Sequence, residues 1–227
     1  MTKIFLFLIA LLGLTVISFF IYIPIFYFLF GIQLLAIALW FLIGCYNVIV
    51  RDSIGYRNYT ILKGFHGIIG RFFIPIFYFN TEKYIRKQFV FNENCRYNSN
   101  EITCINKLFG ISFGWHHKNS IRFGWKYDST DDKIHIFSYV YKNGQYITPR
   151  EIAIVNIGQL YTFKLKYVSN SINVFISLTI YCNHTDEIIG TDVVLYPKLI
   201  PRWGYKLYPY FGGTFKAPHT IKIKEVY

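Results

Sequence analysis

Residues 161–167 read Tyr161-Thr-Phe-Lys-Leu-Lys-Tyr167, and this stretch decides the fold class of the C-terminal part of the chain. Apolar and polar side chains alternate along it. Because successive side chains of a strand point to opposite faces, the four apolar side chains share one face. Ile221-Lys-Ile-Lys224 repeats the alternation. Both stretches therefore predict β-strands that bury one face against a core.

Residues 87–227 continue this pattern beyond those two stretches. Runs rich in aromatic and β-branched residues are separated by turn signals at intervals of roughly 8–12 residues, which is typical of an all-β sandwich or barrel. Asn143-Gly144 favours a two-residue hairpin turn, because both residues tolerate a positive φ. The predicted strands are 87–92, 108–115, 120–127, 133–141, 145–148, 151–155, 160–168, 172–181, 188–195, 204–211 and 219–226.

Several stretches of this domain resemble known proteins. Lys133–Ile147, followed by Gly158–Leu165, resembles the concanavalin A-like jelly roll of lectins and glucanases, in which a strand pair with a tight glycine turn precedes a strand of the form Tyr-x-Phe-x-Leu. Leu207–Ile223 resembles the closing strands of the same family. Asn106–Trp125 is similar to uncharacterised proteins of Bacteroidetes and their phages, which implies no activity. The resemblance to the lectin family implies that residues 87–227 form a jelly-roll β-sandwich.

The N-terminal part of the chain has a different composition. Of the 227 residues, 53% are hydrophobic and 21% aromatic, and the net charge is +12. Residues 1–50 carry a single charged side chain, Lys3. The apolar run from Ile4 to Val50 is more than twice the roughly 20 residues that one bilayer crossing needs. This composition excludes a disordered chain, a collagen and a plain soluble globule.

The apolar run predicts two membrane crossings. Pro24 and Gly31 are the natural breakpoints, because both residues disfavour a helix interior. We therefore expect an N-terminal hairpin of two transmembrane helices at about 4–22 and 30–50.

Residues 51–86 are predicted to form a basic interfacial or re-entrant connector. The segment 61–80 is apolar but contains Lys63, His66 and Arg71, so that it fits an interfacial segment better than a third crossing. A basic flank beside a membrane segment favours the cytoplasmic side. The basic residues expected at the membrane surface are Arg51, Arg57, Lys63, Arg71, Lys83, Arg86 and Lys87.

No catalytic pattern is present in the β-domain. A glycan-cleaving enzyme of this fold needs two carboxylates close together, and the sequence lacks a Glu-x-Asp-x-x-Glu strand. A lyase of this fold would show an Arg-x-Glu-x-Arg strand, which is also absent. Asp131-Asp132 is interpreted as a solvated turn. We therefore expect a protein that is not an enzyme and uses no cofactor.

The histidines and cysteines do not have the spacing of a metal site. His116 and His117 are adjacent, and adjacent residues of a strand point to opposite faces, so that they do not readily bind one ion. We therefore expect no metal and interpret the pair as the end of a hairpin. Cys95 and Cys104 form a disulfide if the domain faces an oxidising space, and remain thiols in the cytoplasm.

Tryptophans are the best candidates for a binding site. Trp115, Trp125 and Trp203, together with His116 and His117, fit a platform on which sugar rings stack, while core packing explains the tryptophans equally well. The pairs Lys164/Lys166 and Lys222/Lys224 fit either a solvated strand face or a contact with anionic lipid.

The sequence thus predicts a membrane-anchored structural or interaction protein. Its partners would be the lipid bilayer and further copies or members of a membrane-associated complex, with the membrane of a lipid-containing phage virion as one specific form. The β-domain would lie on the cytoplasmic or interior side of a bacterial inner membrane or virion membrane. The alternative is a membrane-anchored, lectin-like module that binds polysaccharide, and a glycan-cleaving enzyme is a third hypothesis. No nucleic-acid motif occurs, so no nucleic acid is expected.

Overall fold

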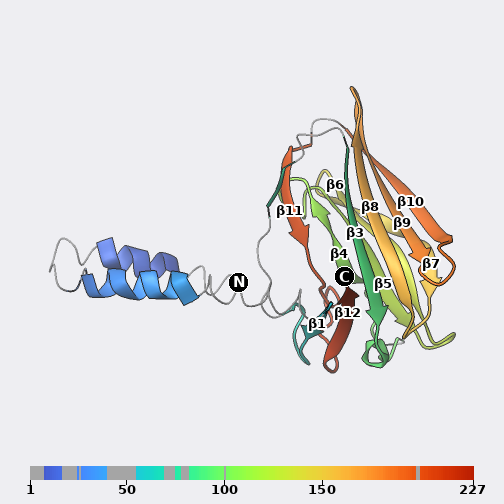
Figure 1. Ribbon diagram of the computed structural model, residues 1–227, viewed down its shortest axis with the longest axis horizontal. Helices are drawn as coiled ribbons and strands as arrows, with labels where there is room; N and C mark the ends of the chain where they lie inside the picture. The colour runs from blue at the N-terminus through green and yellow to red at the C-terminus, as the bar shows by residue number, and fades with distance from the viewer. Residues whose placement is uncertain are drawn as a thin grey trace. The chain divides into compact units, whose positions relative to one another are not determined.

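The computed structural model describes residues 8–16, 25, 27–39, 55–68, 75–77, 82–99, 101–197 and 200–227 (Figure 1). The chain divides into two units. The first consists of Met1–Gly55 and Gly70–Phe72, and the second consists of Tyr56–Ile69 and Phe73–Tyr227.

The second unit is a β-sandwich of two antiparallel sheets with six strands each (Figure 1). The first sheet has the order β1-β12-β3-β8-β9-β10, and the second has the order β2-β11-β4-β5-β6-β7. The strands are β1 (Tyr56–Ile61), β2 (Pro75–Phe77), β3 (Glu82–Phe91), β4 (Asn106–Ser112), β5 (Ser120–Asp128), β6 (Lys133–Lys142), β7 (Gln145–Val155), β8 (Leu160–Ser169), β9 (Asn173–Cys182), β10 (Ile188–Pro197), β11 (Trp203–Leu207) and β12 (Ile221–Val226). A short 3-10 helix, η1 (Glu93–Cys95), follows β3.

The core lies between the two sheets and is built largely from aromatic rings. Phe123 and Phe163, on opposite sheets, have ring centroids 5.1 Å apart, and Phe109 lies 5.2 Å from Phe123. Trp125 is fully buried against Phe91. The alternation read from residues 161–167 is confirmed, because its four apolar side chains are all buried in this core.

The sandwich begins earlier in the chain than residue 87, where the sequence pattern places its start. β1 pairs along its whole length with β12, and β2 pairs with β11. Residues 56–61 and 75–77, which were expected in an interfacial connector, therefore belong to the two sheets. The sequence of β1 does not reveal that it belongs to the sandwich, because its apolar alternation is short. A short edge strand is identified by its pairing partner and not by its own sequence.

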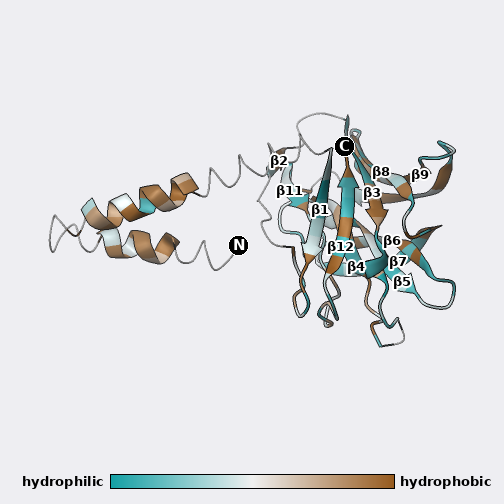
Figure 2. Ribbon diagram, turned by 60° about the horizontal axis from the view of Figure 1, so that its bottom comes forward, coloured by the Kyte–Doolittle hydropathy of each residue, from teal (hydrophilic) through white to brown (hydrophobic). Residues whose placement is uncertain are grey.

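Helical residues occur in the first unit at 8–16 and 27–39. Among the residues that the structure describes, no helix is long and apolar enough to cross a membrane. The expected transmembrane helices at 4–22 and 30–50 are therefore not found in the described part, and the remaining residues of both ranges lie outside it. Gly31 does not interrupt the helix as expected, because it lies inside the second helical stretch. Figure 2 shows these helical residues as mainly hydrophobic.

Candidate functional site

The outer face of the second sheet carries aromatic side chains. In β6, Ile134, Ile136 and Val140 are buried in the core, so that the alternate residues point away from it. Tyr139 and Tyr141 are therefore on the outer face, and both are half-buried. A strand with large apolar or aromatic residues on both faces is unusual in an antiparallel sandwich, in which one face of each sheet is ordinarily solvated and polar.

The rings on this face contact one another in groups, which together we call the aromatic strip. His117 meets Tyr141 with ring centroids 5.4 Å apart, and Tyr141 lies 5.4 Å from Tyr146 of β7. Tyr146 in turn lies 4.8 Å from Tyr139. The members of the aromatic strip are His66, Trp115, His116, His117, Tyr139, Tyr141, Tyr146, Trp203, Tyr205 and Tyr210.

The loop between β4 and β5 supplies one end of the strip. Trp115 is 72% exposed and meets Trp203, which is 43% exposed, edge to face at 6.4 Å. The main chain supports this contact, because the Gly114 N–H donates to the Trp203 carbonyl at 2.7 Å. His116 Nδ1 lies 2.6 Å from the Tyr205 hydroxyl. Two backbone elements that are far apart in the sequence thus hold these rings in place.

The other end of the strip is held by backbone pairing around β4. Lys107 and Tyr210 exchange two backbone hydrogen bonds, of 2.8 and 2.9 Å. The Phe211 N–H donates to the His66 carbonyl at 2.6 Å, and the rings of His66 and Tyr210 stack at 5.2 Å. These hydrogen bonds place the segments that follow β1 and β11 beside the start of β4.

Two cations lie beneath the middle of the strip. Lys107 of β4 and Arg122 of β5 are both more than nine-tenths buried, although they belong to the outer face. The Lys107 ammonium donates to the Gly212 carbonyl at 2.7 Å and lies 4.7 Å from the centre of the Tyr139 ring. Burial, followed by repulsion from Arg122, lowers the pKa of Lys107 to about 8.

Glycine makes room for a close contact on this face. Gly124 pairs with Lys107 across β4 and β5, and a side chain at Gly124 would collide with the side chain of Ile105. The missing side chain at Gly124 therefore lets Ile105 approach β5 closely.

The structure places the predicted ligand-binding residues at two different depths. Trp115, Trp203, His116 and His117 belong to the aromatic strip. Trp125 is fully buried in the core and has no part in it. On β5 the residues two apart from Trp125, such as Phe123, also face the core, which is why alternation places the tryptophan inward.

The sequence missed the tyrosines and the two cations of this face. Tyr139 and Tyr141 follow from the aromatic residues at the outward positions of the 133–142 run, and Tyr146 lies on the next strand, directly after the Asn143-Gly144 turn. Lys107 and Arg122 carry no such signal, because a lysine or arginine in a strand ordinarily indicates a solvated face.

The two adjacent histidines do not point to opposite faces. Their ring centroids are 4.1 Å apart, because residues 115–118 form a turn and not a strand. Even so, no group of three or more His, Cys, Asp or Glu residues in the described part of the chain is arranged so that it could hold a metal ion. Cys95, Cys104 and Cys182 are free thiols, so that the alternative disulfide between Cys95 and Cys104 is not formed.

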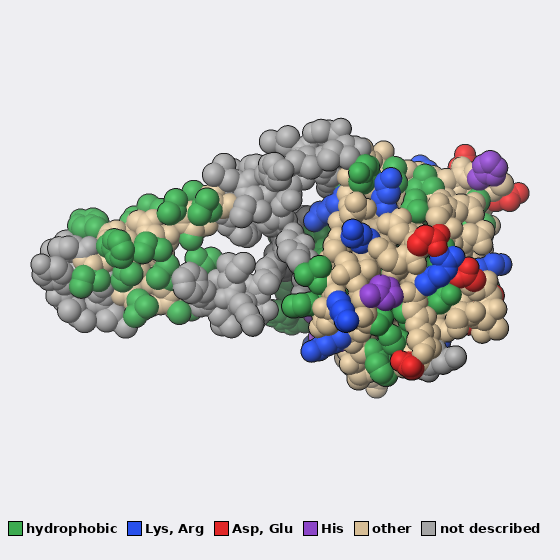
Figure 3. All heavy atoms as spheres, turned by 90° about the horizontal axis from the view of Figure 1, so that it is seen from below, with side chains coloured by type: hydrophobic (Ala, Val, Ile, Leu, Met, Phe, Trp, Pro, Cys, Tyr) green, Lys and Arg blue, Asp and Glu red, His purple; other side chains and the backbone are tan. Residues whose placement is uncertain are grey.

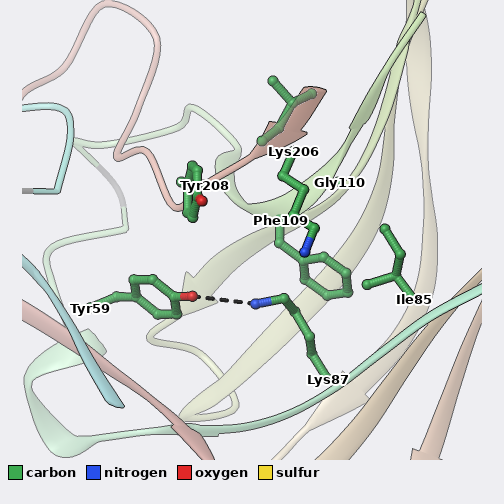
Figure 4. Close-up of a pocket in the computed structure, with 8 residues that line it drawn as sticks. Tyr59, Ile85, Lys87, Phe109, Gly110, Lys206 and Tyr208 are labelled. Atoms are coloured by element: carbon green, nitrogen blue, oxygen red, sulfur yellow. Dashed lines mark hydrogen bonds between the residues drawn. The ribbon is translucent and has the colours of Figure 1, made fainter. Parts of the chain in front are cut away.

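A small pocket lies at one end of the space between the sheets (Figure 4). The ammonium of Lys87 points into it, 3.3 Å from the Tyr59 hydroxyl and 2.6 Å from a carboxylate oxygen of Glu225. Tyr59 also donates to Glu225 at 2.5 Å. Burial lowers the pKa of Lys87, and burial together with Glu225 raises the pKa of Tyr59. The polar groups of this pocket satisfy one another, which is typical of an internal ion pair.

The residues expected at a membrane surface are only partly at the surface. Lys63, Lys83 and Arg86 are exposed. Arg57 is half-buried over the Tyr59 ring, and Lys87 lies in the pocket. Arg51 and Arg71 lie outside the described residues.

Two carboxylates contact His135 on the outer face of β6. His135 Nε2 lies 3.1 Å from Asp131, and His135 Nδ1 lies 2.8 Å from Glu151. Burial lowers the pKa of His135, but the two carboxylates raise it more, so that the net shift is upward. Both carboxylates therefore act as ion-pair partners of one imidazole.

No family model matches the chain, and no curated protein matches it. Solved structures of low similarity include the lectin UEA-II complexed with galactose, with 9% identity over 75% of this chain and 97% of that chain, at a TM-score of 0.39. Lectin II from Ulex europaeus has 10% identity over 75% and 97% of the two chains, at 0.38. The exoplasmic/lumenal domain of VIP36, in its Ca2+/Man-bound form, has 11% identity over 76% and 81%, at 0.38. Likeness at this level carries no inference about a ligand, and the resemblance to proteins of Bacteroidetes and phages stays a prediction.

Proposed function

We propose that the protein is a carbohydrate-binding module, a sandwich of jelly-roll type that binds a polysaccharide chain along its aromatic strip. The observation that carries the proposal is the set of partly exposed indole, phenol and imidazole rings on one face of the second sheet. Sugar rings have apolar C–H faces that stack on aromatic rings, and hydroxyl groups that hydrogen-bond to phenols and imidazoles. The strip offers both kinds of contact along one surface.

An exposed aromatic surface such as the aromatic strip indicates that a partner binds there. Monomeric proteins rarely expose contiguous apolar patches, and aromatic residues are enriched where one end of a side chain stays wet. The rings of Trp115, Trp203 and Tyr146 are exposed while their neighbours are packed, so that the surface is rigid before a ligand arrives. A preorganised surface loses little side-chain entropy on binding.

Binding is tested with the full chain against a panel of neutral and acidic oligosaccharides. We expect the Trp115→Ala, Trp203→Ala and Tyr146→Ala variants each to weaken the best ligand by about two- to tenfold, the range expected for one stacked aromatic contact. The measurement is isothermal titration calorimetry, supported by tryptophan fluorescence. The control is Tyr84→Ala, because Tyr84 is 65% exposed but lies on the other sheet. Unchanged affinity in all three variants, or no binding to any member of the panel, contradicts the proposal.

The proposal includes binding without cleavage. No Asp or Glu belongs to the aromatic strip as defined above, and the carboxylates of Asp131 and Glu151 are held by His135. Incubation of the bound saccharide with the protein should release no shorter products on chromatography. Products that disappear in the Asp131→Asn and Glu151→Gln variants would make the protein an enzyme instead.

We also propose that the N-terminal segment attaches the protein to a lipid bilayer. In the described helical residues, the polar side chains of Thr15 and Gln33 are buried, while large apolar ones such as Leu12 and Leu35 are more than half exposed. Figure 3 shows hydrophobic side chains at the surface of these residues. Polar groups inside and apolar groups outside are typical of helices in lipid. Loss of vesicle binding when residues 1–54 are removed tests this attachment.

A further inference from the structure

We propose that the saccharide bound by the aromatic strip is acidic, with a carboxylate or sulfate group that binds over Lys107 and Arg122. This inference rests on the proposed function and adds the class of ligand to it. It is argued from the burial, the spacing and the partners of the two cations.

The two cations lie in the middle of the strip and not at its rim. Arg122 pairs with Tyr139 across β5 and β6, and Lys107 reaches the same ring from β4. The Lys107 ammonium also lies 5.5 Å from the Tyr210 ring. A ligand that follows the strip from Trp115 to Tyr210 must therefore pass over both charges.

Burial makes these charges effective at the surface of the strip. Lys107 forms no ion pair with any described carboxylate, and the charged group that acts on it most is the like charge of Arg122. Buried charges are screened little by salt water, and a surface with charges of one sign attracts ligands of the other. An anionic group over the strip would offset the repulsion between the two cations.

The carboxylates on this face lie elsewhere. Asp131 and Glu151 are bound to His135, which is four residues before Tyr139 on β6. They leave the centre of the strip positive. Rings to stack on, together with a positive centre, suit a chain of sugar rings that carries negative groups better than a neutral one.

The test compares two ligands that differ only in charge, oligogalacturonate and its fully methyl-esterified form, on the full chain. We expect oligogalacturonate to bind more tightly, with an affinity that falls as sodium chloride is added. Lys107→Met should reduce its affinity on the order of tenfold, as expected for a lost hydrogen bond to a charged group. The neutral ester should bind the wild type and this variant alike.

The matched control is Lys126→Met. Lys126 lies on β5 with Arg122 and faces the same side, but it pairs with His135, which is outside the strip. Its loss should leave affinity for oligogalacturonate within about twofold, because a half-buried charge away from the strip is partly screened by solvent. Melting temperatures and circular dichroism of all variants show whether the fold is intact. If Lys107→Met is unfolded, the inference is tested by the salt dependence of the wild-type affinity for oligogalacturonate alone.

The pH dependence gives a second, independent readout. Galacturonate carboxylates and the Arg122 guanidinium stay charged from pH 6 to 10. The pKa of Lys107 is about 8, so that Lys107 loses its positive charge as the pH rises through this value. Affinity should therefore fall above this pH in the wild type and persist in Lys107→Arg. The other titratable groups beside Lys107 are Tyr139, Tyr210 and Cys104. Burial raises the pKa of Tyr139, as it does that of Tyr146, which contacts Tyr139. Hydrogen bonds that outweigh burial lower the pKa of Cys104. If the fall persists in Lys107→Arg, Cys104 causes it and the inference is wrong.

The outcomes separate the inference from the proposed function. If the ester binds as tightly as the acid and Lys107→Met has no effect, the ligand is a neutral saccharide and only this inference fails. If neither form nor any other saccharide binds, the proposed function fails as well. Equal or tighter binding of oligodeoxythymidylate would identify a nucleic-acid surface and overturn both.

Discussion

The pocket at the end of the sandwich shows how one buried residue depends on another. Lys87 and Glu225 form an ion pair of 2.6 Å in which the side chains are 18% and 6% exposed. Tyr59 donates to the second carboxylate oxygen, so that Glu225 is bound on both sides. A buried charge is tolerated only when such partners replace the water it has lost.

At the residue scale, we predict that Glu225→Gln destabilises the protein by about 3–5 kcal/mol, because it leaves the Lys87 charge buried without its partner. Urea unfolding followed by tryptophan fluorescence measures the change. The double variant Lys87→Met/Glu225→Leu is the control, and it should recover most of the loss because no buried charge remains. Equal stability of the wild type and Glu225→Gln would show that the pair contributes little.

Among the elements, the hairpin of β6 and β7 was readable from two residues. Asn143 and Gly144 adopt φ values of 52° and 82°, so the predicted turn with two positive φ angles is confirmed. The turn also contacts the loop between β4 and β5. The Gly144 N–H donates to the Lys118 carbonyl at 2.8 Å, and the Asn143 N–H donates to the Asn119 side chain at 2.9 Å.

At the element scale, we predict that Gly144→Ala costs about 1–2 kcal/mol of stability, which is the cost of a left-handed conformation for a residue with a Cβ. No atom lies within 4 Å of the new Cβ, so the backbone alone causes the loss. Chemical denaturation measures it. Asn143→Gly is the control, because glycine accepts this conformation and should keep the wild-type stability. A neutral effect of Gly144→Ala would mean that the turn relaxes without strain.

At the scale of the whole molecule, the chain divides into two units. The hydrophobic core of the sandwich runs from Tyr59 to Ile223 and includes no residue of the N-terminal helical stretches. β1 begins at Tyr56 and pairs with β12, so that all six strands of the first sheet lie outside residues 1–54.

At this scale, we predict that a chain of residues 55–227 folds and keeps the melting temperature of the sandwich, since its core remains complete. The same chain should bind the saccharide with unchanged affinity, but it should no longer float with lipid vesicles in a density gradient. Differential scanning calorimetry and flotation of the full and shortened chains provide the comparison. A lower melting temperature would show that the two units stabilise each other, and flotation of the shortened chain would place the lipid contact on the sandwich.

The sequence by itself determined most of the strands and their buried faces. Tyr161–Tyr167 and Asn143-Gly144 show why, because alternation and turn chemistry are local properties that each residue reports through its neighbours. For the same reason the apolar N-terminal segment could be recognised from its composition. Its internal boundaries could not be predicted, because Gly31, the expected breakpoint, lies inside the helical residues 27–39.

Only the tertiary structure decided which surface of the sandwich gathers the candidate site. His66, Lys107, Tyr139 and Tyr210 come from four separate segments, and β1 joins the first sheet only through its pairing with β12. Strand pairing brings residues together across long sequence separations, and no local pattern encodes the partner. Trp115 and Trp125 carry the same side chain ten positions apart, yet one is exposed and the other is in the core. That difference arises because one lies in a turn and the other on the inward face of a strand.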